Sequence, residues 1–577
     1  MVNIKILERS EKMIDFNSII YKRLDYETEK KNVENLTLKL KNSNNFSEFL
    51  NYCKEIICIQ NTIEEMYDYA DIRNMRDSNN QFYINEMNYW NEFKPKFDLL
   101  FLPFYYIIVN SHYKEKLKKV MPDNFFKSIL YKIKTSSQDT VYLEQKENKL
   151  KSKYKKLSNT KINYDGEERS ISYISGFFSN PKRDIRKKAH DAINDFYYSK
   201  QKEYDEIMFE LIKIRNEIAI SSGFNNYVEY SLYKLKRFGY NYEDIKKFRE
   251  NIKKYIVPLC DKISTWKKEE LGIDEIKYYD TVYFIKMPKP LFNGRNLLDK
   301  LSLSFKEIDQ ELSNLYDQML KYGYIDLEQR ENKVNFSITN YLTKSCIPVI
   351  TGNFKNNYLD IKTITHEIGH AFQKYCSSQK DKEFLVSPIL KYPTFEIAEM
   401  FSYAMELIVM DHISYLFNKQ DYNKYCFMEI YNLINMLPYI CLVDEFQEKI
   451  YQKSDLKTED IRKIWLDISK DYNIRKLYKG HINLSSGGYF YRQSHIYLDP
   501  FYYIDYALSY FGAFAIWDSC SKNLDLFKEV GKVASYYPFD YIIKNFNLPN
   551  PFDEKTVKKI TKKLEKELDK RRKSDTL

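Results

Sequence analysis

The sequence predicts a mainly α-helical protein, and three observations lead to that prediction. Glycine and proline, on which most tight turns depend, number only 14 and 15 in 577 residues. Apolar residues recur every three or four positions through long segments, of which residues 46–69 are typical. Runs with the composition of β-strands are confined to the middle of the chain, so any sheet should be small.

The first 200 residues are predicted to form an N-terminal helical lobe. A chain of 577 residues exceeds what one small core accommodates, so two or more domains or subdomains are expected. Residues 1–200 contain no pattern with a chemical function, and His112 and His190 are interpreted as surface or capping histidines. Residues 201–577 carry every motif described below and are predicted to form the second domain.

Two stretches in the middle of the chain have β-type composition. Residues 276–292 are aromatic and β-branched and end in prolines, which indicates a strand or an extended segment. Farther along, the runs VNFSITNYL and IPVITGNF are separated by TKSC, a pattern that predicts a hairpin over residues 334–354. A small β element should therefore come directly before the functional motif.

Composition argues against several classes of protein. The first 17 residues carry charges throughout and lack the apolar core of a signal peptide. The longest apolar run, residues 99–109, is interrupted by Pro103 and has about half the length of a membrane span. The net charge of +10 comes from lysines intermixed with acids, and the eight cysteines form no CxxC pair. We expect a cytoplasmic protein with reduced thiols that binds neither nucleic acid nor membranes.

The sequence HEIGH at residues 366–370 is the strongest functional motif. In a helix, His366 and His370 point to the same side, so both imidazoles can reach one metal ion. Glu367 is placed to approach a water on that ion without binding the metal. With 7 histidines in the chain, the pattern H-[DE]-x-x-H should arise by chance only about 0.01 times. The motif predicts a zinc site with Glu367 as general base.

A third protein ligand is expected because catalytic zinc usually has three and an open position. Residues 394–410 predict a strongly apolar helix that nevertheless carries Glu396, Glu399 and Glu406. A carboxylate in such a helix costs free energy unless it is paired or bound to a metal. Glu399 and Glu406 are seven positions apart and share a face, so one of them can bind zinc while the other orients a ligand histidine.

A tyrosine-rich segment near the C-terminal end supplies candidate hydrogen-bond donors. It contains His495, Tyr502 and Tyr506, and the two tyrosines are predicted to share a helix face after Pro500. A phenol or imidazole N–H that points at the oxyanion of peptide hydrolysis stabilises it. In a chain with 53 tyrosines, however, most such pairs only pack.

Four segments together resemble one known family. They are THEIGHAFQ at residues 365–373, EIAEMFSYAME at 396–406, VDEFQ at 443–447 and HIYLDPFYYIDYAL at 495–508. Their order and spacing resemble the oligoendopeptidase F, Pz-peptidase and thimet oligopeptidase family of zinc peptidases, and most nearly its Pz-peptidase-like branch. The resemblance runs from about residue 270 to residue 520.

The resemblance implies which glutamate binds the metal. The glutamate ligand of the family opens an E-x-x-S-x-x-x-E pattern, which here consists of Glu399, Ser402 and Glu406. Glu399 would therefore be the third ligand of one zinc ion per chain, together with the two histidines of HEIGH. Glu396 would be a bystander.

The resemblance also implies which residues contact the substrate. His495, Tyr502 and Tyr506 would lie near the substrate carbonyl, with Tyr503 as the alternative tyrosine. The family fold is two helical lobes around a deep channel with zinc at its base, which admits only short unfolded peptides. Residues 347–354 are expected to offer a strand edge to such a peptide.

The chain departs from the family pattern at several positions. Phe401 and Glu448 stand where the family often has histidines, and Phe490 replaces a common tryptophan. A glycine-rich segment with tyrosine is replaced by SITNYLTKSC. These changes bear on cleavage preference more than on chemistry, because the metal ligands and the base are intact.

The sequence therefore predicts a zinc-dependent endo-oligopeptidase that cuts internal bonds of short unstructured peptides, with residues 201–577 as the catalytic domain. One alternative is a peptide-binding homologue without activity, although such a protein has no reason to keep Glu367. The other is a zinc carboxypeptidase of related helical fold, which would need a cationic subsite for the free C-terminus.

Overall fold

Helices dominate the structure, which confirms the predicted fold class. The computed structural model describes residues 13–136, 138–334, 336–380, 388–453, 455–520 and 524–572. Helices account for 72% of it. Residues 1–12, which hold most of the charged start of the chain, lie outside the described residues.

The helices follow one another along the chain with few interruptions. The N-terminal ones are α1 (Tyr26–Lys41), α2 (Phe46–Arg76), α3 (Gln81–Leu100), α4 (Leu102–Asn110), α5 (Lys114–Leu117), α6 (Asp123–Thr135) and α7 (Gln138–Ser158). After the short strands β1 (Ile162–Tyr164) and β2 (Glu167–Arg169) come α8 (Ile171–Ser175), α9 (Arg183–Ser199), α10 (Gln201–Ser221), α11 (Tyr227–Lys234), α12 (Tyr242–Asn251), α13 (Val257–Leu271), α14 (Gly294–Ile308) and α15 (Gln310–Lys321).

The second half begins with three strands and then returns to helices. The strands are β3 (Ile325–Asp326), β4 (Ile338–Leu342) and β5 (Ile347–Thr351). The helices are α16 (Leu359–Lys380), α17 (Phe395–Met410), α18 (Lys419–Gln452), α19 (Thr458–Asp471), α20 (Ile482–Ser485), α21 (Ser494–Leu498), α22 (Ile504–Ser519), α23 (Asp525–Val533), α24 (Phe539–Asn545) and α25 (Glu554–Arg572).

Helix α2 illustrates why the amphipathic pattern folds as predicted. Asn45 caps its N-terminus, because the Asn45 side chain accepts a hydrogen bond from the Glu48 amide at 2.9 Å. The apolar residues that recur at helical spacing, among them Phe49, Cys53 and Ile56, are buried. The helix thus turns one stripe toward the core and leaves the other in water.

The predicted hairpin forms, and it belongs to a slightly larger sheet. Strands β4 and β5 pair antiparallel around the TKSC loop, with Ile338 opposite Thr351. The two-residue strand β3 adds to β5 in parallel, which gives the order β3-β5-β4. The expectation that residues 347–354 offer a free edge is therefore wrong, because β5 is the central strand and β4 is at the edge. Residues 276–292 form no strand and instead run as a loop with one short 3-10 turn.

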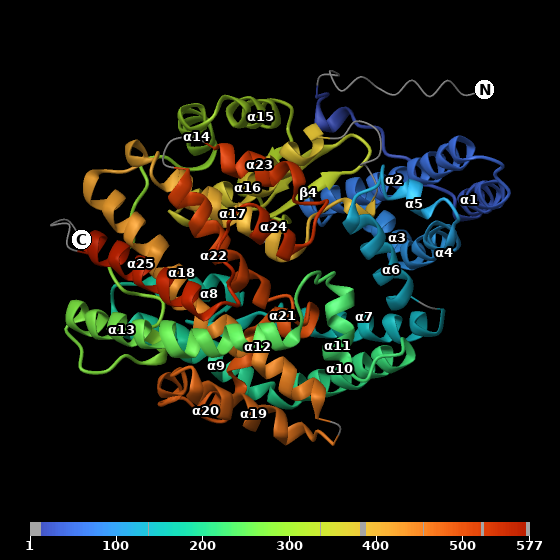
Figure 1. The fold of residues 1–577 in the computed structure, drawn as a ribbon. Helices are drawn as coiled ribbons and strands as arrows, with labels where there is room; N and C mark the ends of the chain where they lie inside the picture. The colour runs from blue at the N-terminus through green and yellow to red at the C-terminus, as the bar shows by residue number, and fades with distance from the viewer. Residues whose placement is uncertain are drawn as a thin grey trace.

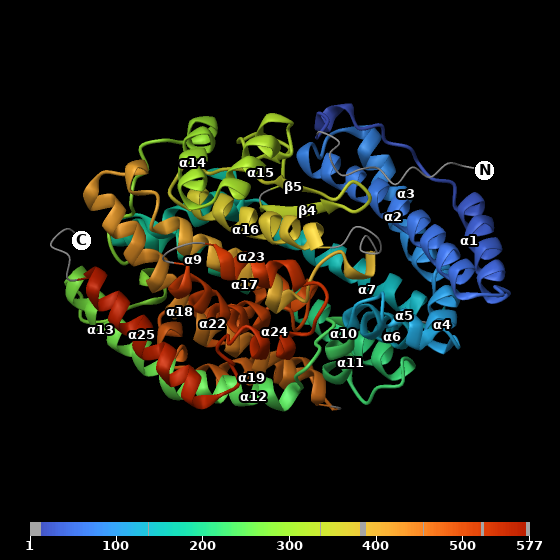
Figure 2. The same cartoon turned by 45° about the horizontal axis from the view of Figure 1, so that its top comes forward.

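The elements are arranged in two tiers with the N-terminal helices at one side. Figure 1 shows the sheet, α16, α17 and α23 in the upper tier, and α9–α13 with α19 and α20 in the lower tier. Helix α22 lies between them and packs against α17. Figure 2 shows the same relation from a second direction, with α1–α4 stacked at one end. Residues from both tiers can therefore meet near α17 and α22.

Two buried apolar clusters stabilise these parts. The smaller consists mainly of residues 24–129 and also includes Ile389, Leu390 and Tyr536. The larger runs through the rest of the chain and already includes residues of α7, α9 and α10. The division into domains at residue 200 stays a prediction.

One helix in the described part of the chain, α18, is long and apolar enough to cross a membrane by length and composition. Within its most apolar window, 78% is buried inside the fold. A core helix of this kind passes the same test, so the observation is weak evidence for a membrane.

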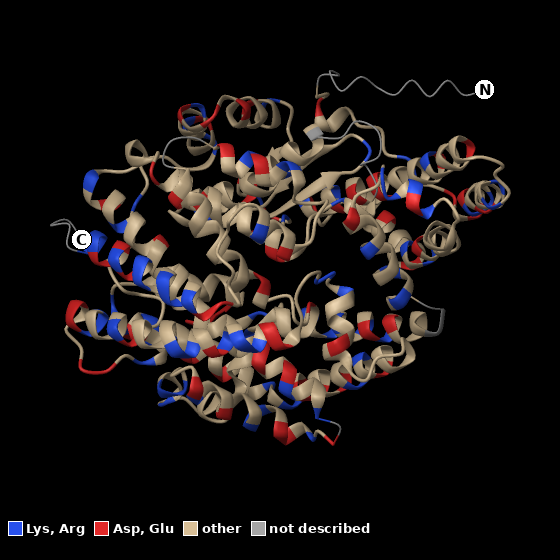
Figure 3. Cartoon of the chain, viewed as in Figure 1, with Lys and Arg blue, Asp and Glu red and all other residues tan. Residues whose placement is uncertain are grey.

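Charge is spread over the outer helices in both signs. Figure 3 shows lysine and arginine residues interleaved with aspartate and glutamate along the same helices, as the sequence has them. Many of the pairs are one helical turn apart, such as Lys187 and Asp191.

Candidate active site

The site is built where α16 crosses α17 at very short range. A Cβ atom at Gly369 would lie 2.6 Å from both the Phe401 carbonyl oxygen and the Ser402 Cα atom of α17. Only glycine fits there without movement of backbone. The close crossing brings the histidines of HEIGH against the glutamates of α17.

Three predicted metal ligands meet at this crossing. His366, His370 and Glu399 each present one ligand atom, and these atoms lie within 4.8 Å of one another. The Glu399 Oε2 atom is 3.4 Å from His366 Nε2 and 3.8 Å from His370 Nε2. Tetrahedral zinc with bonds near 2.0–2.1 Å holds its ligand atoms about 3.3 Å apart. Two imidazoles and a carboxylate at this spacing suit zinc.

Electrostatics keep Glu399 ionised. Burial alone would raise its pKa, but the hydrogen bond from His366 and the two neighbouring imidazoles lower the pKa of Glu399 to about 2. The side chain is 5% exposed. A buried carboxylate held in its charged form is a good ligand for a cation.

The second glutamate on the same face of α17 orients a histidine. Glu406 Oε1 lies 2.6 Å from His366 Nδ1, which leaves Nε2 to face the other ligand atoms. Lys362 in turn pairs with Glu406 at 2.8 Å and with Glu429 of α18 at 3.1 Å. Of the two arrangements that the sequence leaves open, the structure has Glu399 beside both histidines and Glu406 behind one of them.

Glu396 lies outside this group, in agreement with its place in the family pattern. Its Oε1 accepts a hydrogen bond from the Thr394 hydroxyl at 2.8 Å. Burial raises the pKa of Glu396. Its environment favours the neutral form, which is the opposite of what a metal ligand requires.

Glu367 is buried beside the three ligand residues but is not one of them. Its Oε2 accepts a hydrogen bond from the Thr339 hydroxyl of β4 at 2.6 Å, and its side chain is 5% exposed. Burial raises the pKa of Glu367, while His366 and Thr339 oppose that rise. A carboxylate with a raised pKa can exchange a proton near neutral pH more readily than an exposed one.

The tyrosine-rich segment that contains His495, Tyr502 and Tyr506 lies beside the metal-ligand residues. The Tyr502 hydroxyl donates a hydrogen bond to Glu399 Oε1 at 2.8 Å. The ring of Tyr506 is 5.2 Å from that of Tyr502, and the His495 ring is 5.9 Å from each of them. Tyr503 also contacts His495, at 4.8 Å between rings. The structure thus brings His495 and all three tyrosines together.

The predicted shared helix face of Tyr502 and Tyr506 is wrong in one respect. Helix α22 begins at Ile504, so Tyr502 lies in the turn before it. Phe501 has a φ of 67°, and this left-handed residue starts the turn. The side chains still meet because the turn folds back onto the first residues of α22.

Four neighbours of the site were not anticipated from the sequence. Gln493 Nε2 lies 2.8 Å from His495 Nδ1, and the Tyr439 hydroxyl donates to Gln493 Oε1 at 3.0 Å. Tyr403 of α17 packs 5.3 Å from His366, ring to ring. Tyr403 is four positions after Glu399, so helical spacing alone could have indicated it. Thr339 comes from a strand and gives no such signal.

Comparison with known proteins shows the family and the fold of the chain. Residues 177–537 match peptidase family M3, and residues 16–136 match the peptidase M3 N-terminal domain. A structure of Pz peptidase A with inhibitor 2 is 31% identical, with a TM-score of 0.90 over 96% of this chain and 99% of that chain. A protein of Bacillus anthracis str. Ames, provisionally named oligoendopeptidase F, is 28% identical, with a TM-score of 0.86 over 97% and 99%.

One further relative is less similar to this chain in sequence than these two proteins are. Oligopeptidase PepF of Bacillus subtilis (strain 168) is 23% identical over 413 residues, which span 67% of this chain and only 58% of that protein. The M3 match alone covers more than half of the chain. By this match and by its fold, the chain belongs to peptidase family M3.

Proposed function

We propose that this protein is a zinc-dependent endo-oligopeptidase that hydrolyses internal bonds of short, unstructured peptides. The observation that carries the proposal is the set of three ligand atoms from His366, His370 and Glu399, with the buried carboxylate of Glu367 beside them. Family membership and the likeness to Pz peptidase A and oligopeptidase PepF support it.

His366, His370 and Glu399 would hold the zinc ion. Bound there, zinc would supply a Lewis acid for the scissile carbonyl and an acidified water. Glu367 takes a proton from the attacking water and passes it to the leaving amine. Its hydrogen bond from Thr339 fixes the carboxylate in place between these two transfers.

His495 and the tyrosines stabilise the developing oxyanion in this proposal. The amide nitrogen of Gln493 can only donate, so Nδ1 of His495 accepts its hydrogen bond. Burial lowers the pKa of His495, which favours the neutral ring. A neutral imidazole that accepts at Nδ1 carries its proton on Nε2, and this N–H is a suitable oxyanion donor.

The edge of the sheet can account for a preference for extended peptides. Strand β4 is an edge strand, and the hydroxyl group of its Thr339 donates a hydrogen bond to Glu367. An extended peptide that pairs with β4 would lie along the site with its backbone held and its side chains free of tight selection.

All eight cysteines are free, which supports our further proposal of a reducing cytoplasmic location.

The decisive experiment changes the base without changing the ligands. Glu367→Gln should keep one zinc per chain and lose turnover by roughly 10²–10⁴, the usual contribution of a general base. Zinc content by metal analysis and peptide products by mass spectrometry, with and without chelator, measure the two effects separately. Activity within about tenfold of the parent would contradict the role of Glu367. A parent protein that cuts no peptide when loaded with zinc would instead favour the peptide-binding alternative.

A further inference from the structure

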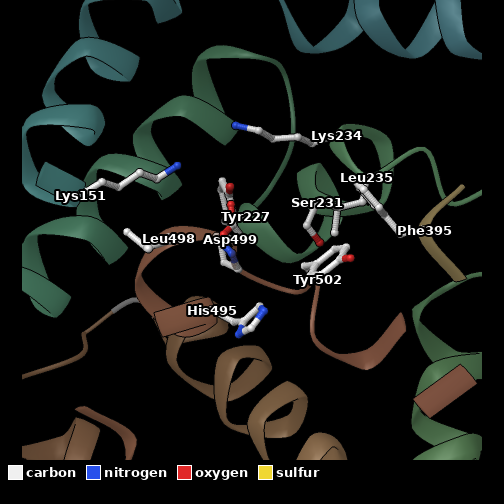
Figure 4. Close-up of a pocket in the computed structure, with 11 residues that line it drawn as sticks. Lys151, Tyr227, Ser231, Lys234, Leu235, Phe395, His495, Leu498, Asp499 and Tyr502 are labelled. Atoms are coloured by element: carbon white, nitrogen blue, oxygen red, sulfur yellow. The ribbon is translucent and has the colours of Figure 1, made fainter. Parts of the chain in front are cut away.

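A cleft of about 280 Å³ opens beside the candidate active site. His495 and Tyr502 form part of its wall, and Phe395 and Leu235 give it an apolar side. Figure 4 shows His495 and Tyr502 at one end of this cleft and Lys151, from α7, at the other.

Two lysines from different helices line the cleft. Lys151 and Lys234 are both labelled in Figure 4, and Lys234 is the last residue of α11. The only acid among the residues that line the cleft in the described structure is Asp499. The wall therefore carries more positive than negative charge.

The charges of the two lysines are incompletely balanced. Lys151 pairs with Glu147 at 3.1 Å, but the same Glu147 oxygen also accepts a hydrogen bond from the buried Arg215 at 2.8 Å. One carboxylate is thus shared by two cations. Lys234 makes no ion pair within the part of the chain that the structure describes, and its Nζ atom lies 5.6 Å from the centre of the Tyr230 ring. Burial lowers the pKa of Lys234, but Tyr230, Glu147 and Glu144 raise it above its ordinary value, so these two glutamates offset part of the charge.

The cleft adjoins the metal-ligand group through the side chain of Tyr502. Tyr502 lines the cleft and also donates its hydroxyl hydrogen bond to Glu399. His495 also lines the cleft, and its ring lies 5.9 Å from that of Tyr502. A peptide whose scissile bond lies at the ligand group would therefore place a neighbouring part of its length in the cleft.

We propose that this cleft is a subsite for a carboxylate of the peptide substrate, bound by the ammonium groups of Lys151 and Lys234. The inference rests on the proposed peptidase function and adds a charge preference to it. A carboxylate accepts charge-assisted hydrogen bonds from two ammonium groups, and the apolar wall suits the methylene groups that carry it. The carboxylate comes either from an aspartate or glutamate side chain or from the free C-terminus of a short peptide.

The test uses matched peptides and matched lysine variants. The peptides share one sequence and differ only by Glu or Gln at one position, scanned on either side of the cut, and by a free or an amidated C-terminus. The variants are Lys151→Met and Lys234→Met, which remove charge and keep length. Lys149→Met is the control, because Lys149 is an exposed lysine of the same helix as Lys151 and does not line the cleft.

We expect the parent to cut the acidic form of a peptide with a kcat/KM about tenfold or more above that of its neutral match, mainly through a lower KM. Lys234→Met should remove most of that ratio and Lys151→Met should lower it as well, whereas Lys234→Arg should keep it and Lys149→Met should leave it unchanged. Asp499→Asn should raise the ratio, because it removes the one negative charge from the wall.

The two peptide series identify the source of the carboxylate. A preference that survives amidation belongs to a side chain. One that disappears on amidation belongs to the C-terminus, and products cut only at that end would then favour the carboxypeptidase alternative. Equal cleavage of acidic and neutral peptides by the parent overturns the subsite while the peptidase function stands. A Lys234→Met variant that keeps the full ratio overturns the role of that lysine. Absence of any cleavage, in contrast, contradicts the peptidase function itself.

Discussion

Two glutamates three positions apart on α17 have opposite chemical environments. Glu399 lies 3.4 Å and 3.8 Å from the two histidine nitrogens and is held ionised, whereas burial favours the neutral form of Glu396. Glu399→Ala should therefore lose most of its zinc, and Glu396→Gln, which imitates a protonated glutamate, should keep one zinc per chain. Metal analysis of both purified variants decides the assignment. Normal zinc in Glu399→Ala together with loss in Glu396→Gln would reverse it.

The hydrogen bond between Gln493 and His495 leads to a second residue-level prediction. Gln493→Glu replaces a donating amide with a carboxylate that accepts from Nδ1, so the proton moves away from Nε2. We expect kcat to fall by roughly 10²–10³, the usual loss of one oxyanion donor, while zinc content and KM change little. Steady-state kinetics of a short peptide give both constants. Gln493→Met serves as the comparison, because it removes the bond without imposing the wrong tautomer and should cost less. An equal loss in both variants would point to packing instead.

Site residues that recur at helical spacing could be placed together from the sequence, and residues without such spacing could not. The relation of His366, His370, Glu399 and Glu406 follows from spacings of four and seven on two helices. His112 is exposed as predicted, but the interpretation of His190 as a surface or capping residue is wrong. Its side chain is buried and stacks 3.6 Å from the Phe178 ring. Such a contact depends on where a separate turn packs, which a single sequence does not encode locally.

At the scale of elements, the crossing of α16 and α17 depends on Gly369. In an exposed helix, alanine is favoured over glycine by about 1 kcal/mol. At Gly369 the added methyl group would instead meet backbone atoms at 2.6 Å, so Gly369→Ala should destabilise the protein by roughly 1–3 kcal/mol and weaken zinc binding. Denaturant unfolding and zinc titration measure the two effects.

The matched control for that substitution is Gly176→Ala. Gly176 has a φ of −57°, and no atom lies within 4 Å of the Cβ position. Its substitution should leave stability unchanged or slightly raised. If Gly369→Ala is as harmless as Gly176→Ala, the two helices can move apart freely and the close crossing does not fix the site.

The hairpin was predictable because two β-type runs flank a short polar loop. The third strand was not, since β3 has only two residues and carries no periodic pattern. Because β3 pairs with Ile350 and Thr351 of β5, the edge that residues 347–354 were expected to leave free is occupied. A strand's neighbours are a tertiary property, even when the strand itself is plain in the sequence.

At the scale of the whole molecule, the recessed position of the site leads us to expect a limit on the size of the substrates. Glu367 and Glu399 are each 5% exposed as whole residues, and the side chains of the two histidines are about one fifth exposed. We expect short unstructured peptides to be hydrolysed and native folded proteins to remain intact. Incubation with a stable globular protein and with the peptides derived from it, followed by mass spectrometry, compares the same bonds in both states. Efficient digestion of the native protein would refute the limit.

The boundary between parts of the molecule is less evident in the sequence than its helical class. Helices follow one another without a proline- or glycine-rich linker, so composition marks no border near residue 200. The buried clusters also mix distant segments, as when Ile389 and Tyr536 join the N-terminal helices. Packing of this kind is decided by complementary surfaces that local patterns do not reveal.

The placement of the metal ligands has a consequence for how the protein is assembled. His366, His370 and Glu399 all come from α16 and α17, which are consecutive helices in the chain. Contacts between neighbouring segments cost little loop entropy and form early in folding. His495 and Tyr502 come from a later part of the chain, which must dock afterwards. During synthesis, the capacity to bind a metal ion is thus expected to arise before the capacity to cut a peptide. We therefore expect a nascent chain to pass through a stage at which its metal ligands are assembled but it cannot yet hydrolyse the peptides around it.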